Sequence, residues 1–226
     1  MSQNRCAAEG CRQPTVRIFS LMNHATERIF GVVLAGGESR RFGQAKALAT
    51  LRGAPMASWG VRALRAAGLA VGVVSDEEGV EAALSVATRP DLEAGLGPIG
   101  GLWTALRWAQ EQGDDGVQLL GCDMPLVSEA ILRTVLGWSA KAAAVVPMGS
   151  EGPEPLCALY RPACAPEVEH RLRSKDQSLR GLAKAVGAVF IGEEVVAEVS
   201  DPRVAFLNVN TVEDRDRAET LLDSQP

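Results

Sequence analysis

Short apolar runs alternate with helical stretches along most of this 226-residue chain, and this alternation restricts the fold more than any other feature. The runs over 29–35, 71–75 and 117–122 have the length of buried strands. Residues 57–67 and 102–111 separate these runs and space their apolar side chains as helices do. Strands that alternate with helices form a mainly parallel sheet. We therefore predict an α/β fold with a mostly parallel, doubly wound sheet and flanking helices.

The pattern continues toward the C-terminus. Residues 142–147 and 156–160 are predicted as a fourth and a fifth strand. After Pro162 helices dominate, and short strands are expected near Val189 and Ala205.

Two helix starts carry capping residues. Ser128 can cap a helix that runs to about Leu136. Thr211 opens the last helix, and Asp214 three residues later resembles a capping box with Asp in place of Glu.

The first 28 residues show little periodicity. We predict that residues 1–28 form an N-terminal arm, which can be disordered, and that residues 29–226 form the domain. Cys6, Cys11 and His24 lie in the arm, but a fourth ligand and CxxC spacing are missing, so zinc binding is not expected.

Bulk properties exclude several classes of protein. The net charge of -5 gives no basic field for a nucleic acid. No apolar run reaches the ~18 residues that a membrane span needs. The five cysteines have no spacing typical of a disulfide framework, which fits a reducing, cytoplasmic location.

A glycine-rich loop follows the first predicted strand, where open α/β sheets bind ligands. Its glycines allow backbone N–H groups to approach phosphate oxygens, and its cations add positive charge. The spacing excludes a Walker A loop and a dinucleotide fingerprint. A generic turn with solvated arginines is the alternative, and the cations in register favour phosphate binding. The residues concerned are Gly36, Gly37, Arg40, Arg41, Gly43 and Lys46.

An acidic turn and an asparagine pair are further candidates. Asp123 directly follows the strand over 117–122, where its carboxylate can hold Mg²⁺ beside a phosphate. A plain turn-forming Asp is the alternative. In an extended segment Asn208 and Asn210 lie on one side and can bind the same metal or an acceptor. Helix capping is the alternative for them, and Thr211 already serves that need.

These motifs together resemble the molybdenum cofactor guanylyltransferase family, within the nucleotidyltransferases of Rossmann-like fold. The resemblance covers about 29–222, with the motifs in the family's order. They lie at 34–43 with Lys46, at 97–101 with Asp91 upstream, at 122–125, at 153–160 and at 208–214.

The resemblance implies roles for individual residues. Ser75 stands where some members place an Asn near the base or ribose. The implied catalytic residues are Lys46, Arg40 and Asp123, with Asp123 as the metal ligand. The implied nucleotide-binding residues are Leu34, Ala35, Gly36, Gly37, Lys46, Ser75, Asp91, Gly97 and Asp123, and the implied acceptor-binding residues are Pro155, Asn208 and Asn210.

The resemblance also implies a reaction, in which GMP passes from GTP to the molybdopterin cofactor, with Mg²⁺ as cofactor and pyrophosphate as leaving group. Such an acceptor is already anionic, so no protein base is required. Gly36 favours GTP over CTP, because cytidylyl-specific relatives carry Ala there and a missing Cβ lets a purine approach the backbone.

Other functions stay open at this stage. They are a CTP-dependent cytidylyltransferase or another small-molecule phosphate nucleotidyltransferase, a non-catalytic nucleotide-binding protein, and a chaperone of molybdoenzymes. Transient contacts with molybdoenzymes or cofactor-insertion proteins are expected partners beside the substrates.

Overall fold

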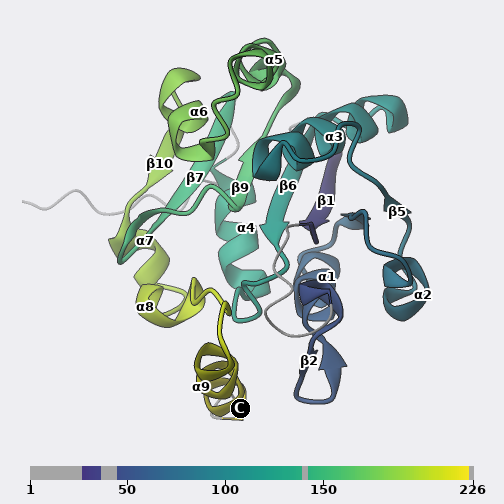
Figure 1. The fold of residues 1–226 in the computed structure, drawn as a ribbon. Helices are drawn as coiled ribbons and strands as arrows, with labels where there is room; N and C mark the ends of the chain where they lie inside the picture. The colour runs from purple at the N-terminus through teal and green to yellow at the C-terminus, as the bar shows by residue number, and fades with distance from the viewer. Residues whose placement is uncertain (1–26, 37–44, 139–141, 224–226) are drawn as a thin grey trace, which may run out of the picture.

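The computed structural model describes residues 27–36, 45–138 and 142–223 (Figure 1). A central sheet runs in the order β10-β7-β9-β6-β1-β4-β5, and β8 pairs with β7. A separate hairpin is formed by β2 and β3. The strands are β1 Ile29–Leu34, β2 Thr50–Leu51, β3 Ala54–Pro55, β4 Ala70–Val74, β5 Thr88–Arg89, β6 Gly116–Gly121, β7 Ala144–Gly149, β8 Gly152–Pro153, β9 Cys157–Tyr160 and β10 Val189–Ile191.

The sheet confirms the predicted class and adds the antiparallel strands β8 and β9. Strands β1, β4, β5 and β6 pair in parallel, as do β7 and β10. Strand β9 pairs antiparallel with both β6 and β7. Parallel pairing needs a long crossover, and the short connection from β7 to β9 leaves no room for a helix. The chain therefore turns back and inserts β9 in the opposite direction.

Helices cover both faces of the sheet, as a doubly wound fold requires (Figure 1). Buried side chains of α1, α2, α4 and α7 share one core with the sheet, and those of α3, α5 and α6 share another. The helices are α1 Met56–Ala66, α2 Val80–Leu84, α3 Gly97–Gln112, α4 Glu129–Gly137, α5 Ala165–Ser174, α6 Leu179–Ala185, α7 Glu193–Ala197, α8 Pro202–Ala205 and α9 Val212–Asp223, with short 3₁₀ turns η2 Lys46–Leu48 and η3 Pro162–Cys164.

The predicted helix caps are present. Ser128 Oγ accepts a hydrogen bond from the Ile131 N–H at the start of α4. At the start of α9, the Asp214 N–H donates to Thr211 Oγ1, and the Asp214 carboxylate accepts from the Thr211 N–H. The capping box is therefore complete with Asp in place of Glu.

The strand expected near Ala205 is wrong, because this segment is the short helix α8. Asp201 caps it by accepting a hydrogen bond from the Arg203 N–H at 3.0 Å, and Pro202 occupies the first turn. Proline is favoured at that position because its fixed φ suits a helix.

A third, smaller core joins the C-terminal helix to the hairpin. Ala218 and Leu222 of α9 are buried with Leu51 of β2 and Val209. The Arg52 N–H donates to Glu219 Oε1 at 2.9 Å. These contacts hold the segment before α9 against the carboxyl ends of strands β1 and β6.

The start of the domain is anchored by two residues that were assigned to the arm. Arg161 Nη2 lies 2.7 Å from Glu27 Oε2, and the Arg28 N–H donates to Asp115 Oδ2 at 2.9 Å. Residues 1–26, including Cys6, Cys11 and His24, lie outside the described residues. No described helix is long and apolar enough to cross a membrane.

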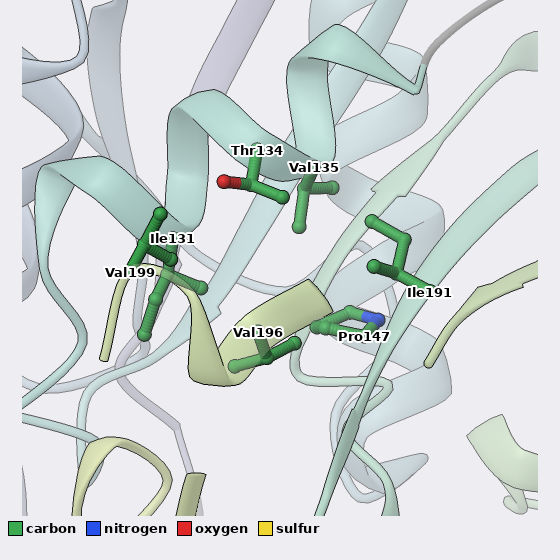
Figure 2. A pocket seen from close by; sticks show the side chains of 7 residues that line it. All are labelled: Ile131, Thr134, Val135, Pro147, Ile191, Val196 and Val199. Carbon is green, nitrogen blue, oxygen red and sulfur yellow. The ribbon is translucent and has the colours of Figure 1, made fainter. Parts of the chain in front are cut away.

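An apolar pocket lies where α4 and α7 pack beside β10 (Figure 2). Among the described residues its lining is aliphatic apart from Thr134 and Pro147. Without charged groups it is unsuited to a polyphosphate. Its other lining residues are Ile131, Val135, Ile191, Val196 and Val199.

Candidate active site

Three predicted site residues meet at the carboxyl ends of β1 and β6. Lys46 Nζ lies 2.8 Å from Asp123 Oδ2 and donates a second hydrogen bond, also of 2.8 Å, to Asn210 Oδ1. They are 77 and 164 residues from Lys46 in the sequence. The fold therefore gathers the end of the glycine-rich loop, the acidic turn and the asparagine segment around one ammonium group.

Backbone hydrogen bonds fix this arrangement. The Cys122 N–H donates to the Leu34 carbonyl at 3.0 Å, which ties the acidic turn to the end of β1. The Val209 N–H donates to the Asp123 carbonyl at 2.8 Å, which ties the asparagine segment to the same turn. Asn210 therefore reaches Lys46 from a segment that is itself bonded to Asp123.

A glycine leaves room for the Asp123 carboxylate. A Cβ on Gly121 would lie 2.7 Å from Asp123 Oδ1, closer than real Cβ atoms approach. Oδ2 pairs with Lys46, so Oδ1 is the oxygen left to bind a further group. Next to it, burial and the nearby Asp123 charge raise the pKa of the Cys122 thiol to about 12. Cys122 therefore stays a neutral thiol and does not act as a nucleophile.

Lys46 is well placed to act on an anion. Its side chain is 12% exposed, so the ammonium is held near the surface without being solvated freely. An ammonium has three N–H donors, and the described residues accept two hydrogen bonds from Lys46. Within the described part of the chain, the third donor has no partner and can reach a phosphate oxygen.

On the nucleotide side, Ala35 and Ser75 are joined by a hydrogen bond. Ser75 is 5% exposed, and its hydroxyl donates to the Ala35 carbonyl at 3.0 Å and accepts from the Glu77 N–H. The hydroxyl thus fixes the backbone at the end of β1. Contact of Ser75 with a nucleotide stays a prediction. Leu34 packs toward Gly101 of α3, where an added Cβ would lie 2.9 Å from its side chain.

Asp91 lies close to Gly36. A Cβ on Gly36 would lie 3.9 Å from Asp91 Oδ2, with no other atom of the described residues within 4 Å. Thr104 Oγ1 donates to Asp91 Oδ1, and the Asp91 N–H donates to Asp76 Oδ1. Burial, followed by the charge of Asp76, raises the pKa of the Asp91 carboxyl. Gly36 is exposed, so an alanine methyl there would meet no tightly packed atom of the described residues.

Gly97 is held by a loop between α5 and α6. It has φ of +61°, and an added Cβ would lie 2.9 Å from Gln177 Oε1. Gln177 Nε2 donates to the Gly95 carbonyl at 3.2 Å. The positive φ favours a glycine at position 97, and a larger residue there would also displace the Gln177 side chain.

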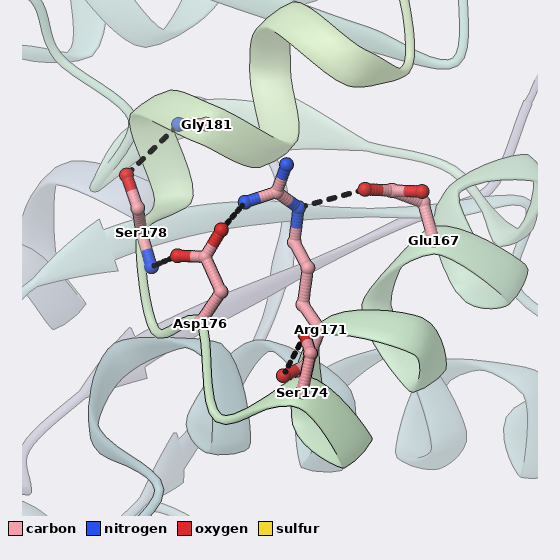
Figure 3. Close-up of polar contacts among 6 residues, drawn as sticks. All are labelled: Glu167, Arg171, Ser174, Asp176, Ser178 and Gly181. Carbon is pink, nitrogen blue, oxygen red and sulfur yellow. Dashed lines mark hydrogen bonds and ion pairs between the residues drawn. The ribbon is translucent and has the colours of Figure 1, made fainter.

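An arginine fixes the loop that carries Gln177 (Figure 3). Arg171 bonds Glu167 on its own helix and Asp176 in the loop. Asp176 in turn accepts from the Ser178 N–H, so the residues on either side of Gln177 are both anchored. Sequence reasoning missed this support, because its members lie in none of the motifs.

On the acceptor side, Pro155 and Asn208 differ in position. Pro155 is buried, and its carbonyl accepts a hydrogen bond of 2.8 Å from the Tyr160 hydroxyl. Asn208 lines a cleft of about 460 Å³ together with Glu154 and Phe206. Val209, between the two asparagines, is buried. The structure thus brings Asn210 to Lys46 and leaves Asn208 at the cleft.

Some predicted residues cannot be located. Gly37 and Arg40 lie outside the described residues, as do Arg41 and Gly43. Their phosphate contacts stay predictions.

Comparison with known proteins places the chain in a family. The model of the MobA-like NTP transferase domain matches residues 31–189. A molybdenum cofactor guanylyltransferase of Cereibacter sphaeroides is 33% identical over 198 residues, which cover 86% of this chain and 97% of that protein. A probable molybdenum cofactor guanylyltransferase of Pelotomaculum thermopropionicum is 32% identical over 202 residues, covering 86% and 93%. The chain belongs to the molybdenum cofactor guanylyltransferase family.

Solved structures agree with this assignment. Molybdopterin-guanine dinucleotide biosynthesis protein A of Archaeoglobus fulgidus superimposes with a TM-score of 0.72 at 26% identity, covering 86% of this chain and 99% of that one. A Mycobacterium tuberculosis protein solved in complex with manganese has a TM-score of 0.64 at 20% identity, covering 86% and 98%. That second likeness shows the fold alone. As a member of the family, the chain is a nucleotidyltransferase.

The residues present fit a divalent metal that is shared with substrate. No group of three or more His, Cys, Asp or Glu side chains in the described residues could hold a metal alone. Asp123 offers one carboxylate, partly exposed at 21%, with Oδ1 available. Mg²⁺ is commonly held by one or two carboxylates, waters and substrate phosphates, which suits this donor set.

Proposed function

We propose that this member of the molybdenum cofactor guanylyltransferase family transfers GMP from GTP to the molybdopterin form of the cofactor, releasing pyrophosphate. The observation that carries the proposal is the meeting of Lys46, Asp123 and Asn210 at the ends of β1 and β6. The names of the relatives support the choice of GTP and molybdopterin.

The proposed reaction is a displacement at phosphorus. An oxygen of the acceptor phosphate attacks the α-phosphorus of GTP and forms a new P–O bond. The bond from the α-phosphorus to the bridging oxygen breaks, and pyrophosphate leaves with that electron pair. The attacking oxygen already carries negative charge, so the protein supplies alignment and charge stabilisation in place of a base.

Each residue of the centre has a proposed part. The free N–H of Lys46 donates to a phosphate oxygen and stabilises the charge that develops on it. Asp123 Oδ1 would hold Mg²⁺, and the bound ion would supply positive charge that neutralises phosphate oxygens. Asn210 keeps the ammonium of Lys46 directed toward the site by accepting one of its hydrogen bonds. Arg40 is proposed to add positive charge from the glycine-rich loop.

The remaining site residues are proposed to select the nucleotide and the acceptor. Leu34, Ala35, Gly36 and Gly37 are proposed to contact the nucleotide, and Gly36 is proposed to leave space for a purine. Ser75, Asp91 and Gly97 complete the nucleotide side. Pro155, Asn208 and Asn210 are proposed for the acceptor side.

We place the reaction in the cytoplasm, because buried Cys122, Cys157 and Cys164 are free thiols, as in reducing compartments. Residues 1–28 are proposed to be an arm that guanylyl transfer does not need. Transient contacts with molybdoenzymes or cofactor-insertion proteins are proposed to take up the product.

Pyrophosphate release tests the function. The enzyme is incubated with Mg²⁺ and GTP, CTP or ATP, each with and without molybdopterin cofactor. We expect release with GTP that depends on both Mg²⁺ and acceptor. Preference for CTP would instead indicate a cytidylyltransferase, and absence of release with every nucleotide would contradict the proposal.

A further inference from the structure

A cleft beside the centre contains the carboxylate of Glu154, which lies in the motif at 153–160 but is not among the residues given a predicted role. The cleft, of about 460 Å³, lies between the β7–β8 turn, the segment that precedes α9, and α9 itself. Glu151 and Glu154 line it from one side, and Phe206, Asn208 and Arg217 line it from the other. Its volume suits a small ring system.

Glu154 is half-buried in this cleft, and among the described residues no hydrogen bond or ion pair to its carboxylate is found. Its backbone, by contrast, is fixed: the Glu154 N–H donates to the Pro147 carbonyl, and the Glu154 carbonyl accepts from the Cys157 N–H. A carboxylate held this way, without a donor, is ready to accept hydrogen bonds from a ligand.

A glycine opens the space for this carboxylate. A Cβ on Gly149 would lie 3.0 Å from Glu154 Oε1 and 2.8 Å from the Phe206 ring. The absent side chain therefore lets an acidic group and an aromatic ring approach the same strand end. Phe206 is 6% exposed, so part of an apolar surface lies beside the carboxylate.

The environment of Glu154 disfavours a free charge. Burial raises the pKa of its carboxyl to about 7, Arg180 opposes the rise, and Asp123 and Glu151 add to it. A ligand that donates two hydrogen bonds would relieve this unfavourable burial.

The chemistry of the site matches one edge of a pterin. The 2-amino-4-oxo ring of a pterin presents a ring N–H next to an exocyclic NH₂ group. These two parallel donors match the two oxygens of a carboxylate in the way that an arginine fork does. An aromatic ring beside the carboxylate suits a flat heterocycle.

We propose that Glu154 recognises the donor edge of the acceptor's pterin ring, with Phe206 and Asn208 beside it, and so determines the specificity for a 2-amino heterocycle. This inference rests on the proposed function for the identity of the acceptor. It assigns Glu154 a part in binding and none in the phosphoryl transfer itself.

The test compares two ring systems that differ at one position. The probes are the monophosphate of 6-hydroxymethylpterin and that of the corresponding lumazine, which carries oxygen in place of the 2-amino group. Binding to the full-length enzyme is followed by probe fluorescence, without GTP. A carboxylate accepts from the pterin and repels the lumazine oxygen, so the wild type should bind the pterin ~10-fold or more tightly than the lumazine.

Glu154→Gln should bring the ratio of pterin affinity to lumazine affinity close to one, or reverse it. The amide can donate to the lumazine oxygen and accept from its ring N–H, so lumazine binding should improve while pterin binding weakens. Glu151→Gln is the matched control, because it lines the same cleft and should leave the ratio unchanged. Thermal unfolding of each variant verifies that the fold is retained.

An unchanged ratio in Glu154→Gln, an equal loss of both probes, or binding of neither probe to the wild type would overturn the inference. Failure of the proposed function has a different signature. If the ratio depends on Glu154 but GTP yields no pyrophosphate with molybdopterin, the pterin site stands and the transfer reaction does not.

Discussion

Two carboxylates near the carboxyl ends of the central strands differ in their partners: among the described residues, one is paired with a cation and the other is not. Asp123 lies two residues after the end of β6 and pairs with Lys46 at 2.8 Å, beside Asn210. Glu154 follows β8 and has no such partner in the described residues, and burial raises the pKa of its carboxyl to about 7. The ion pair of Asp123 and Lys46 suits the binding of a metal ion and a phosphate, because it offers negative charge to the metal and positive charge to the phosphate. The surroundings of Glu154 suit a neutral ligand with hydrogen-bond donors, and each prediction below perturbs one side of this difference.

The largest effect is expected from Asp123→Ala. It removes the one carboxylate that the described centre offers to Mg²⁺ and leaves Lys46 without its ion pair. We expect metal-dependent pyrophosphate release to be abolished. The measurement is activity as a function of Mg²⁺ concentration. Asp216→Ala, on the exposed face of α9, is the control. Residual activity with an unchanged half-saturating Mg²⁺ concentration would mean that Asp123 is only a turn residue.

Lys46→Ala should lower turnover by ~10²–10³-fold, the usual cost of losing a group that stabilises transition-state charge. Single-turnover rates with saturating GTP and acceptor give the effect on the chemical step. Arg52→Ala removes a cation whose partners lie on α9, and it should keep nearly full turnover. Turnover of Lys46→Ala within twofold of the wild type would contradict its role.

Gly121→Ala tests the placement of Asp123 without removing any functional group. The new methyl would lie 2.7 Å from Asp123 Oδ1 and should displace the carboxylate. Because misplacement of a catalytic group by ~1 Å can cost 10²-fold, we expect kcat/KM to fall by ~10–100-fold. Gly137→Ala is the matched control, since its added Cβ has no described atom within 4 Å. Equal activity of both variants would show that Asp123 tolerates displacement.

Gly36→Ala should change specificity more than stability. Its Cβ would meet only Asp91 Oδ2 at 3.9 Å among the described residues, so the folded protein has room for it. We expect the ratio of kcat/KM for GTP over CTP to fall by ~10-fold, from a lost or strained contact with the base. If the variant unfolds at the same temperature as the wild type and its GTP-to-CTP ratio is unchanged, Gly36 does not determine nucleotide specificity.

The smallest effect is a pH dependence of stability that arises from Glu154. Its pKa rises from 4.5 to about 7 on folding, so the folded state holds the proton more tightly than the unfolded state. This contribution is fully present below pH 4.5 and is lost as the pH rises through about 7. The wild type should therefore gain stability relative to Glu154→Gln when the pH is lowered from 8 to 5. Parallel melting curves across that range would contradict the assignment.

Much of the fold followed from the sequence, because each strand and helix has a local signal. The runs over 29–35 and 117–122 became β1 and β6, and Ser128 caps α4 as predicted. The direction of β9 did not follow, because it depends on where the chain turns after β7 and on no local periodicity. The strand near Ala205 was wrong because the cap at Asp201 and the proline after it favour a helix.

The site was predictable where a motif marks it. Lys46, Asp123 and Asn210 lie in three separate motifs, and the structure brings their side chains together at one point. Gln177 lies in none of the motifs, because its importance comes from contacts across the fold. Glu154 lies in the motif at 153–160, but no role was predicted for it, because its half-buried position in the cleft appears only in the folded chain. The two prolines around Glu154 were a signal, since they fix the backbone that presents the carboxylate.

The proposed reaction moves the α-phosphate of the nucleotide to the acceptor. This transfer can be followed with GTP labelled at the α-phosphate, Mg²⁺ and molybdopterin cofactor, and separation of the products. We expect the label to appear in a dinucleotide that retains the pterin, and this product to be absent with Asp123→Ala. Label that remains in GTP, or that is released as free GMP with no pterin-containing product, would contradict the proposed reaction.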